Sequence, residues 1–115
     1  MMVNEKYQRC LDACQACAVA CNQCAAACLQ EEDVKMMARC IQLDMDCAQV
    51  CSLTAAYLAR NSEFAGQLCD VCAQVCDACA AECSQHDHEH CQRCAAACRR
   101  CADECRHMMS MGGSM

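Results

Sequence analysis

Apolar and polar positions alternate along this chain with the period of an α-helix. The small apolar residues Cys and Ala recur at steps of three and four, and polar side chains fill most of the positions between them. Such steps place side chains on one stripe of a helix, whereas a strand would need steps of two. Gaps of 12, 18 and 8 residues divide the cysteines into four groups. The pattern therefore predicts four helices, over roughly 4–28, 32–60, 63–85 and 88–109.

The connections between these segments are short, near Leu29–Glu31, Asn61–Ser62 and His86–Asp87. Short connections make consecutive helices antiparallel neighbours. We therefore expect an all-α fold, an antiparallel up-down-up-down four-helix bundle with a cysteine-lined core. Residues 1–115 are expected to form this single domain, with a flexible tail over 110–115.

Composition changes the picture of the core. Leu, Ile, Val and Phe together number 14, about 12% of the chain, and the aromatic residues are Tyr7, Tyr57 and Phe64. A chain able to bury an ordinary core usually has more than about 20% of these aliphatic and Phe residues. Disorder is a poor alternative, because Ala is abundant, Pro is absent and only three Gly occur. Cysteine must therefore fill the interior.

Charge and hydropathy exclude several partners. Nine basic and 15 acidic residues give a net charge of −6, and the basic residues are scattered, which argues against nucleic acid. No apolar run approaches the roughly 18 residues of a membrane span. The first residues show neither an apolar signal segment nor a twin-arginine pair, so a cytoplasmic location is expected.

The 19 cysteines are expected to be free thiols. Their number is odd, and the cytosol keeps thiols reduced. Fourteen of the 18 gaps between them are three or four residues, a spacing of long helices, whereas small disulfide scaffolds are rich in loops. A structural or redox protein with disulfides between helices remains an alternative. An enzyme is least expected, because no Ser–His–Asp pattern, phosphate loop or polar cleft is evident.

Thiol stripes on four helices favour a soft metal ion. Thiolates select Cu(I), zinc or iron–sulfur clusters. Zinc needs four ligands in a tetrahedron, usually from turns and loops, whereas Cu(I) accepts two or three. Sulfurs at i and i+3 or i+4, or on facing helices, supply two or three ligands without rearranging the backbone. Multiple Cu(I) ions per chain are therefore the favoured cofactor, and a metallothionein-like buffer for zinc or cadmium is the alternative.

The unit CxxCAxxC recurs along the chain, among other places over Cys21–Cys28, Cys76–Cys83 and Cys91–Cys98. With four predicted helices and no signal peptide, the chain resembles the cytosolic branch of the bacterial copper storage proteins. The resemblance covers Cys10 to Cys105. It implies a homotetramer of four-helix bundles that stores many Cu(I) ions along each bundle axis. A copper chaperone or a small-thiol donor is a candidate partner.

The resemblance also implies that all the cysteines are ligands. They are Cys10, Cys14, Cys17, Cys21, Cys24, Cys28, Cys40, Cys47, Cys51, Cys69, Cys72, Cys76, Cys79, Cys83, Cys91, Cys94, Cys98, Cys101 and Cys105.

The second predicted helix contains only three of these cysteines. Between Cys40 and Cys47 the stripe passes either Leu43 or Asp44. The favoured interpretation places Leu43 in the inner layer and Asp44 toward solvent. In the alternative, the Asp44 carboxylate lies among the thiols, where it ligates an ion or holds a water molecule.

One end of the bundle is predicted to be a mouth for copper. Stepping outward from the cysteine stripes reaches Met36, Met37, His86 and His88, and one of the two methionines is expected to be a ligand. His90 lies off this register and is expected to be a solvated loop residue.

The opposite end is predicted to be a hydrophobic plug. It gathers Tyr7, Leu58, Phe64, Leu68 and Met108. Near the C-terminus a further set could bind copper, although a flexible tail is the favoured interpretation. These residues are His107, Met109, Met111 and Met115.

Overall fold

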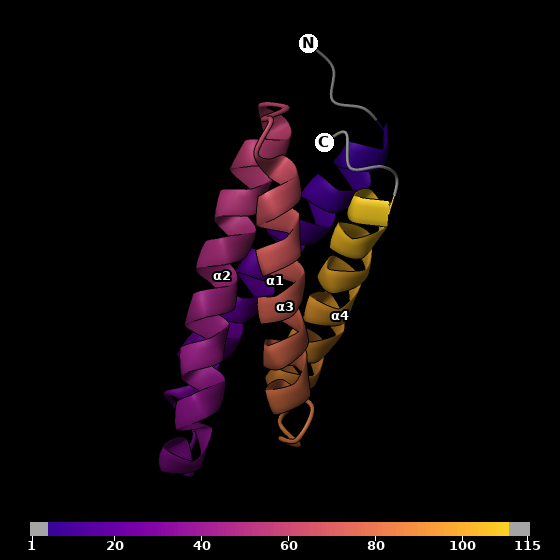
Figure 1. Cartoon of the computed structure of the whole chain (residues 1–115). Helices are drawn as coiled ribbons and strands as arrows, with labels where there is room; N and C mark the ends of the chain where they lie inside the picture. The colour runs from indigo at the N-terminus through magenta and orange to yellow at the C-terminus, as the bar shows by residue number, and fades with distance from the viewer. Residues whose placement is uncertain (1–4, 111–115) are drawn as a thin grey trace.

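The structure is a computed structural model that describes residues 5–110, and it is built from α-helices. The elements are α1 (Glu5–Cys28), a short 3-10 helix η1 (Val34–Met37), α2 (Ala38–Ala59), α3 (Ala65–Cys83) and α4 (Glu89–Ser110). No strand occurs among these residues. Figure 1 shows the four long helices running alternately up and down, which confirms the predicted antiparallel bundle.

Each helix contacts its two neighbours around one shared interior. Helix α1 lies against α2 and α4, and α3 lies against the same two helices from the other side. The bundle is elongated, with principal extents of 47 × 22 × 18 Å. The connections 29–37 and 84–88 lie together at one end, here called the mouth, and the connection 60–64 lies at the opposite end (Figure 1).

The start of the second helix differs from the prediction. The chain forms turns over 29–33 and one 3-10 turn, η1, before α2 begins at Ala38 rather than near residue 32. The amide N–H of Met36 donates to the carbonyl oxygen of Asp33 at 2.9 Å. Within this 3-10 turn the two adjacent methionines point in different directions. The Met37 side chain is fully buried, whereas Met36 is 74% exposed.

The turn between α2 and α3 depends on one residue with positive φ. Asn61 adopts φ 56°, a left-handed conformation that Asn tolerates better than most residues. The amide of Ser62 then reaches the carbonyl oxygen of Tyr57, and the amide of Asn61 reaches that of Leu58, each at 3.0 Å. These two bonds satisfy the last carbonyl groups of α2 and reverse the chain into α3.

Cysteine fills the interior, as the composition predicts. All nineteen cysteines are fully buried, and the larger residues that are fully buried with them are few: Met37, Asp44, Thr54, Leu58 and Met108. Alanines lie beside the cysteine stripes and let the helices approach closely. None of the described helices is both long and apolar enough to cross a membrane.

The end opposite the mouth is closed by fewer residues than predicted. Leu58 and Met108 are buried there, and Tyr7 and Leu68 are half-buried. Phe64 is 53% exposed, so its assignment to the plug is wrong. The first inward position of α3 is Ala65, one residue later and about 100° further round the helix, so the Phe64 side chain faces solvent. Met109 is half-buried against the core, while Met111 and Met115 lie outside the described residues.

The metal-free protein should already be a folded helical bundle. Neutral thiols behave as small hydrophobic groups, and the alanine-rich helices need no ion to form. Far-UV circular dichroism of the reduced, metal-free protein should therefore show high helix content. A spectrum of disordered chain that became helical only when Cu(I) was added would contradict this expectation.

Candidate metal centre

The sulfur atoms form a continuous column along the bundle axis. All 19 cysteines are free and buried, and neighbouring Sγ atoms lie 3.2 to 4.0 Å apart. Cys17 illustrates the arrangement, because its sulfur contacts one cysteine on its own helix and one on each of the other three. Its partners are Cys21 at 3.9 Å, Cys47 at 3.7 Å, Cys76 at 4.0 Å and Cys98 at 3.6 Å.

These separations suit two sulfur donors on one ion. A metal–thiolate bond of about 2.3 Å places two donors on the same ion about 3.8–4.0 Å apart at tetrahedral or trigonal angles. The column can therefore accept soft ions with little movement of the helices.

The sulfurs fall into overlapping groups of four, and within each group all the sulfurs lie within 4.8 Å of one another. Cys17, Cys21, Cys98 and Cys101 each belong to two such groups. A sulfur shared by two groups can bridge two ions, so the four groups that share members form one connected lattice. Five of the groups are Cys14–Cys72–Cys101–Cys105, Cys17–Cys51–Cys76–Cys101, Cys17–Cys21–Cys47–Cys98, Cys21–Cys79–Cys94–Cys98 and Cys24–Cys28–Cys40–Cys91.

Asp44 lies inside this lattice, and the favoured interpretation of the sequence is wrong at this position. Its side chain is fully buried, while Leu43 lies half-buried at the edge of the core. The reason is visible in the spacing: Cys40, Asp44 and Cys47 follow steps of four and three, the same alternation that the cysteines of α1 follow. Asp44 occupies the position where α2 lacks a sulfur.

Thiols surround the Asp44 carboxyl group. Its Oδ1 accepts hydrogen bonds from the thiols of Cys79 at 3.2 Å and of Cys83 and Cys94 at 3.3 Å, and Cys40 lies 3.8 Å from Oδ2. Burial raises the pKa of Asp44 to about 10, and the neighbouring Cys94 adds to the shift. In the metal-free protein the carboxyl group is therefore neutral at pH 7.

The column becomes three-sided toward the end opposite the mouth. The next inward position of α2 after Cys51 is Thr54, whose hydroxyl donates to the carbonyl oxygen of Val50 at 2.7 Å. That bond satisfies the hydroxyl within its own helix. Only α1, α3 and α4 supply sulfurs at this level, from Cys10, Cys69 and Cys105.

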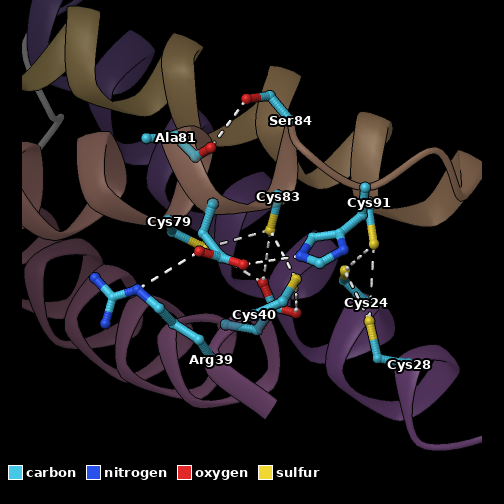
Figure 2. Close-up of polar contacts among 12 residues, drawn as sticks. Cys24, Cys28, Arg39, Cys40, Cys79, Ala81, Cys83, Ser84 and Cys91 are labelled. Atoms are coloured by element: carbon cyan, nitrogen blue, oxygen red, sulfur yellow. Dashed lines mark hydrogen bonds and ion pairs between the residues drawn. The ribbon is translucent and has the colours of Figure 1, made fainter. Parts of the chain in front are cut away.

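His90 covers the column at the mouth, so the expectation of a solvated loop residue is also wrong. Its Nδ1 lies 3.6 Å from the sulfurs of Cys24 and Cys91 and 3.8 Å from that of Cys28. Side chains lean toward the N-terminus of their helix, so a residue in the first turn of α4 reaches over the end of the column. Figure 2 shows Cys24, Cys28 and Cys91 close together at this end, beside Cys40 and Cys83.

The four predicted mouth residues occupy different environments. Met37 is fully buried in the core and Met36 is exposed. The His86 Nε2 atom lies 2.8 Å from a Glu82 carboxylate oxygen, and His88 lies between two carboxylates of the connection 29–37. Met37 therefore lies in the same core as the column, while the two imidazoles contact carboxylates at its rim.

Two thiols at the mouth, those of Cys28 and Cys91, hold their protons in the metal-free protein. Burial raises the pKa of the Cys28 thiol to about 11, and burial also raises the pKa of Cys91. Thiolate is the form that binds metal, so each ion that enters must displace protons.

Comparison with known proteins agrees with this geometry. The sequence model of the copper storage protein family matches residues 3–110. A cytosolic copper storage protein from Streptomyces lividans carrying five coppers is 44% identical, with a TM-score of 0.89 over 92% of this chain and 93% of its own. Metal-free Csp3 from Bacillus subtilis is 42% identical, with a TM-score of 0.82 over 89% of this chain and 97% of its own.

A third solved structure is the Cu(I)-bound copper storage protein BsCsp3. It is 42% identical, with a TM-score of 0.88, and the match covers 91% of this chain and 99% of that protein. A search of curated protein sequences finds no match.

The variant Asp44→Asn should change how the stability of the metal-free protein depends on pH. Between the ordinary pKa of 3.8 and the folded value of about 10, the folded wild type keeps a proton that the unfolded chain releases. Raising the pH through this window therefore destabilises the wild type, by at most about 1.4 kcal/mol per pH unit. Asn has no such proton, and its oxygen can still accept the three thiol hydrogen bonds.

Urea unfolding under reducing conditions at pH 5 and pH 8 measures the difference. The free energy of unfolding of Asp44→Asn relative to wild type should increase between the two pH values. The exposed Asp46→Asn, two residues away, is the control and should show no such increase. An unchanged difference for Asp44→Asn would show that the buried carboxyl group is not protonated at neutral pH.

Proposed function

Because the chain belongs to the copper storage protein family, its function is copper storage, and we propose that the nineteen buried cysteines are the ligands that hold the copper as Cu(I). The observation that carries this proposal is the column itself, in which every cysteine sulfur is buried and neighbouring sulfurs lie at distances suited to one ion. Storage needs many equivalent sites in a protected interior, and the column provides them.

Charge balance explains why the stored ion is Cu(I). When a thiol exchanges its proton for Cu(I), one positive charge replaces another, and the interior stays neutral. A zinc ion held by four thiolates would leave a net charge of −2 in the same dry interior, where an uncompensated charge is costly. The column therefore disfavours a general buffer for divalent ions.

We also assign an oxygen ligand to the column. Asp44 fills the gap in the sulfur stripe of α2, and its Oδ1 already contacts three thiols that belong to α3 and α4. An ion bound to these sulfurs would lie next to the carboxylate. Its negative charge would offset one positive charge wherever copper ions outnumber thiolates locally.

Copper should load through the mouth. His90 is the ring that both solvent and the column reach, because its side chain is 14% exposed and its Nδ1 faces three sulfurs. Met36, Met37, His86 and His88 lie in the connections at this same end and offer thioether and imidazole ligands there. At the opposite end, Leu58 and Met108 are buried and close the interior to water.

The assembly and the location of the protein are part of this proposal. We propose that the protein works in the cytoplasm as a homotetramer, as its resemblance to the cytosolic branch implies. The Streptomyces relative is described as cytosolic. A copper chaperone or a small-thiol compound would deliver the ion at the mouth.

The copper capacity should be close to one Cu(I) per cysteine. If each ion used two thiolates of its own, 19 cysteines would hold about nine ions, whereas bridging thiolates allow about one ion each. The overlapping sulfur groups favour bridging. Titration of the reduced protein with Cu(I) in the presence of a chromophoric chelator measures the capacity, and saturation near nine would contradict the bridged column.

The variant His90→Ala should slow loading while nearly preserving capacity. The imidazole is the first ligand that connects solvent to the buried sulfurs, and all 19 thiols remain in the variant. Stopped-flow transfer of Cu(I) from a chelator gives the rate. His107→Ala, an exposed histidine at the opposite end, is the matched control. Equal rates in wild type and His90→Ala, or equal slowing by both variants, would place the entrance elsewhere.

A further inference from the structure

A second group of donor atoms lies at the rim of the mouth, outside the sulfur column. One carboxylate oxygen of Glu31, Oε2, lies 2.8 Å from Nε2 of His90 and 3.3 Å from Nδ1 of His88. The other ring nitrogen of His88, Nε2, lies 3.3 Å from Oδ1 of Asp33. The imidazole rings of His88 and His90 are nearly parallel, with centroids 5.3 Å apart.

The Glu31 oxygen lies at ligand-like separations from one nitrogen of each ring. Metal bonds of about 2.0–2.2 Å to nitrogen and carboxylate oxygen separate neighbouring ligand atoms by about 3.3 Å in a tetrahedron. The separations of 2.8 and 3.3 Å from the Glu31 oxygen are close to this value. A shared ion would require the two stacked rings to turn so that both nitrogens point toward it.

The remaining nitrogen of each ring has its own partner. Imidazoles that ligate metals usually hydrogen bond through their other nitrogen, which fixes the tautomer and the ring orientation. Asp33 fills this role for His88, and the thiols of Cys24 and Cys91 fill it for His90. The rim therefore has both the ligand atoms and the groups that orient them.

We propose that Glu31, His88 and His90 bind a divalent cation of borderline softness, such as Zn(II), with Asp33 positioning His88. Two imidazoles and a carboxylate form a zinc ligand set that leaves a fourth position for water. The side chains are 14% to 31% exposed, so an ion reaches them directly from solvent. Glu31 and Asp33 supply two negative charges against the two positive charges of the ion.

The rim and the column select different ions. Oxygen and imidazole donors suit zinc-like divalent ions, whereas thiolates suit Cu(I). A divalent ion at the rim is neutralised by carboxylates in contact with solvent, whereas one that enters the buried column must displace thiol protons. The first equivalent of zinc should therefore bind at the rim and not among the sulfurs.

Occupation of the rim should also affect copper loading. A neutral imidazole has one free lone pair, so His90 cannot give it to a divalent ion through Nε2 and to Cu(I) through Nδ1 at the same time. The two ions therefore compete at the mouth, and zinc should slow the loading of Cu(I) without lowering the number of sulfur sites.

Zinc K-edge X-ray absorption tests the ligand set. With one equivalent of Zn(II) on the reduced, copper-free protein, the first shell should contain nitrogen and oxygen at about 2.0–2.2 Å. A sulfur shell at about 2.3 Å in the wild type would place zinc in the column and overturn the proposal.

Competition with a chromophoric zinc chelator then tests the individual residues. Glu31→Gln and His88→Ala should each weaken the first zinc site at least tenfold, and Asp33→Asn by about 10–100-fold, as expected for an orienting carboxylate. Glu32→Gln is the matched control, since it removes an exposed carboxylate between Glu31 and Asp33 and should leave the zinc affinity unchanged. Equal zinc affinity in His88→Ala and Glu32→Gln would overturn the proposal, while copper capacity in all four variants reports separately on the column.

Discussion

The interior of this bundle must stay electrically neutral while its contents change, and most of its structure follows from that constraint. Burying an uncompensated charge costs several kcal/mol even after relaxation. A thiol is neutral when protonated, and a thiolate paired with a monovalent ion is again neutral. The metal-free protein can therefore keep 19 cysteines fully buried as an apolar core, and each Cu(I) that replaces a proton leaves that balance unchanged. A cargo of divalent ions would not permit this exchange.

Rigid helices make the exchange possible without refolding. The steps of three and four residues keep every sulfur of a helix on its inner stripe, and the alanines beside them let the four helices approach closely. Sulfur therefore faces sulfur both along each helix and across to the next, at nearly constant distances. Metallothionein-like chains fold around their ions, whereas here the protein prepares the ligand positions in advance. We therefore expect binding to proceed with small changes in conformation and access to the column to control its rate.

The fold and the column could be predicted because one periodic signal determines both. The details at Asp44, His90 and Phe64 could not be settled in the same way. Leu43 and Asp44 both lie near the inner stripe, and hydrophobicity favoured Leu43, but the steps from Cys40 to Cys47 place Asp44 inward, where four thiols provide hydrogen bonds. Asp44 is buried because neighbouring thiols donate hydrogen bonds to its carboxyl group, and a hydropathy scale contains no information about such donors.

The predictions for His90 and Phe64 were wrong for a different reason. Residues near helix ends leave the periodic register, because the direction of the chain there depends on the turn that precedes the helix. Phe64 immediately precedes the first inward residue of α3, so it points outward, and His90 leans back over the column from the first turn of α4. The mouth is formed by residues near helix ends, where the preceding turn, and not the periodic pattern, sets the direction of the side chains. The mouth therefore contains oxygen and nitrogen donors that the thiol stripe cannot supply. These donors suit harder divalent ions, whereas the sulfurs behind them suit Cu(I).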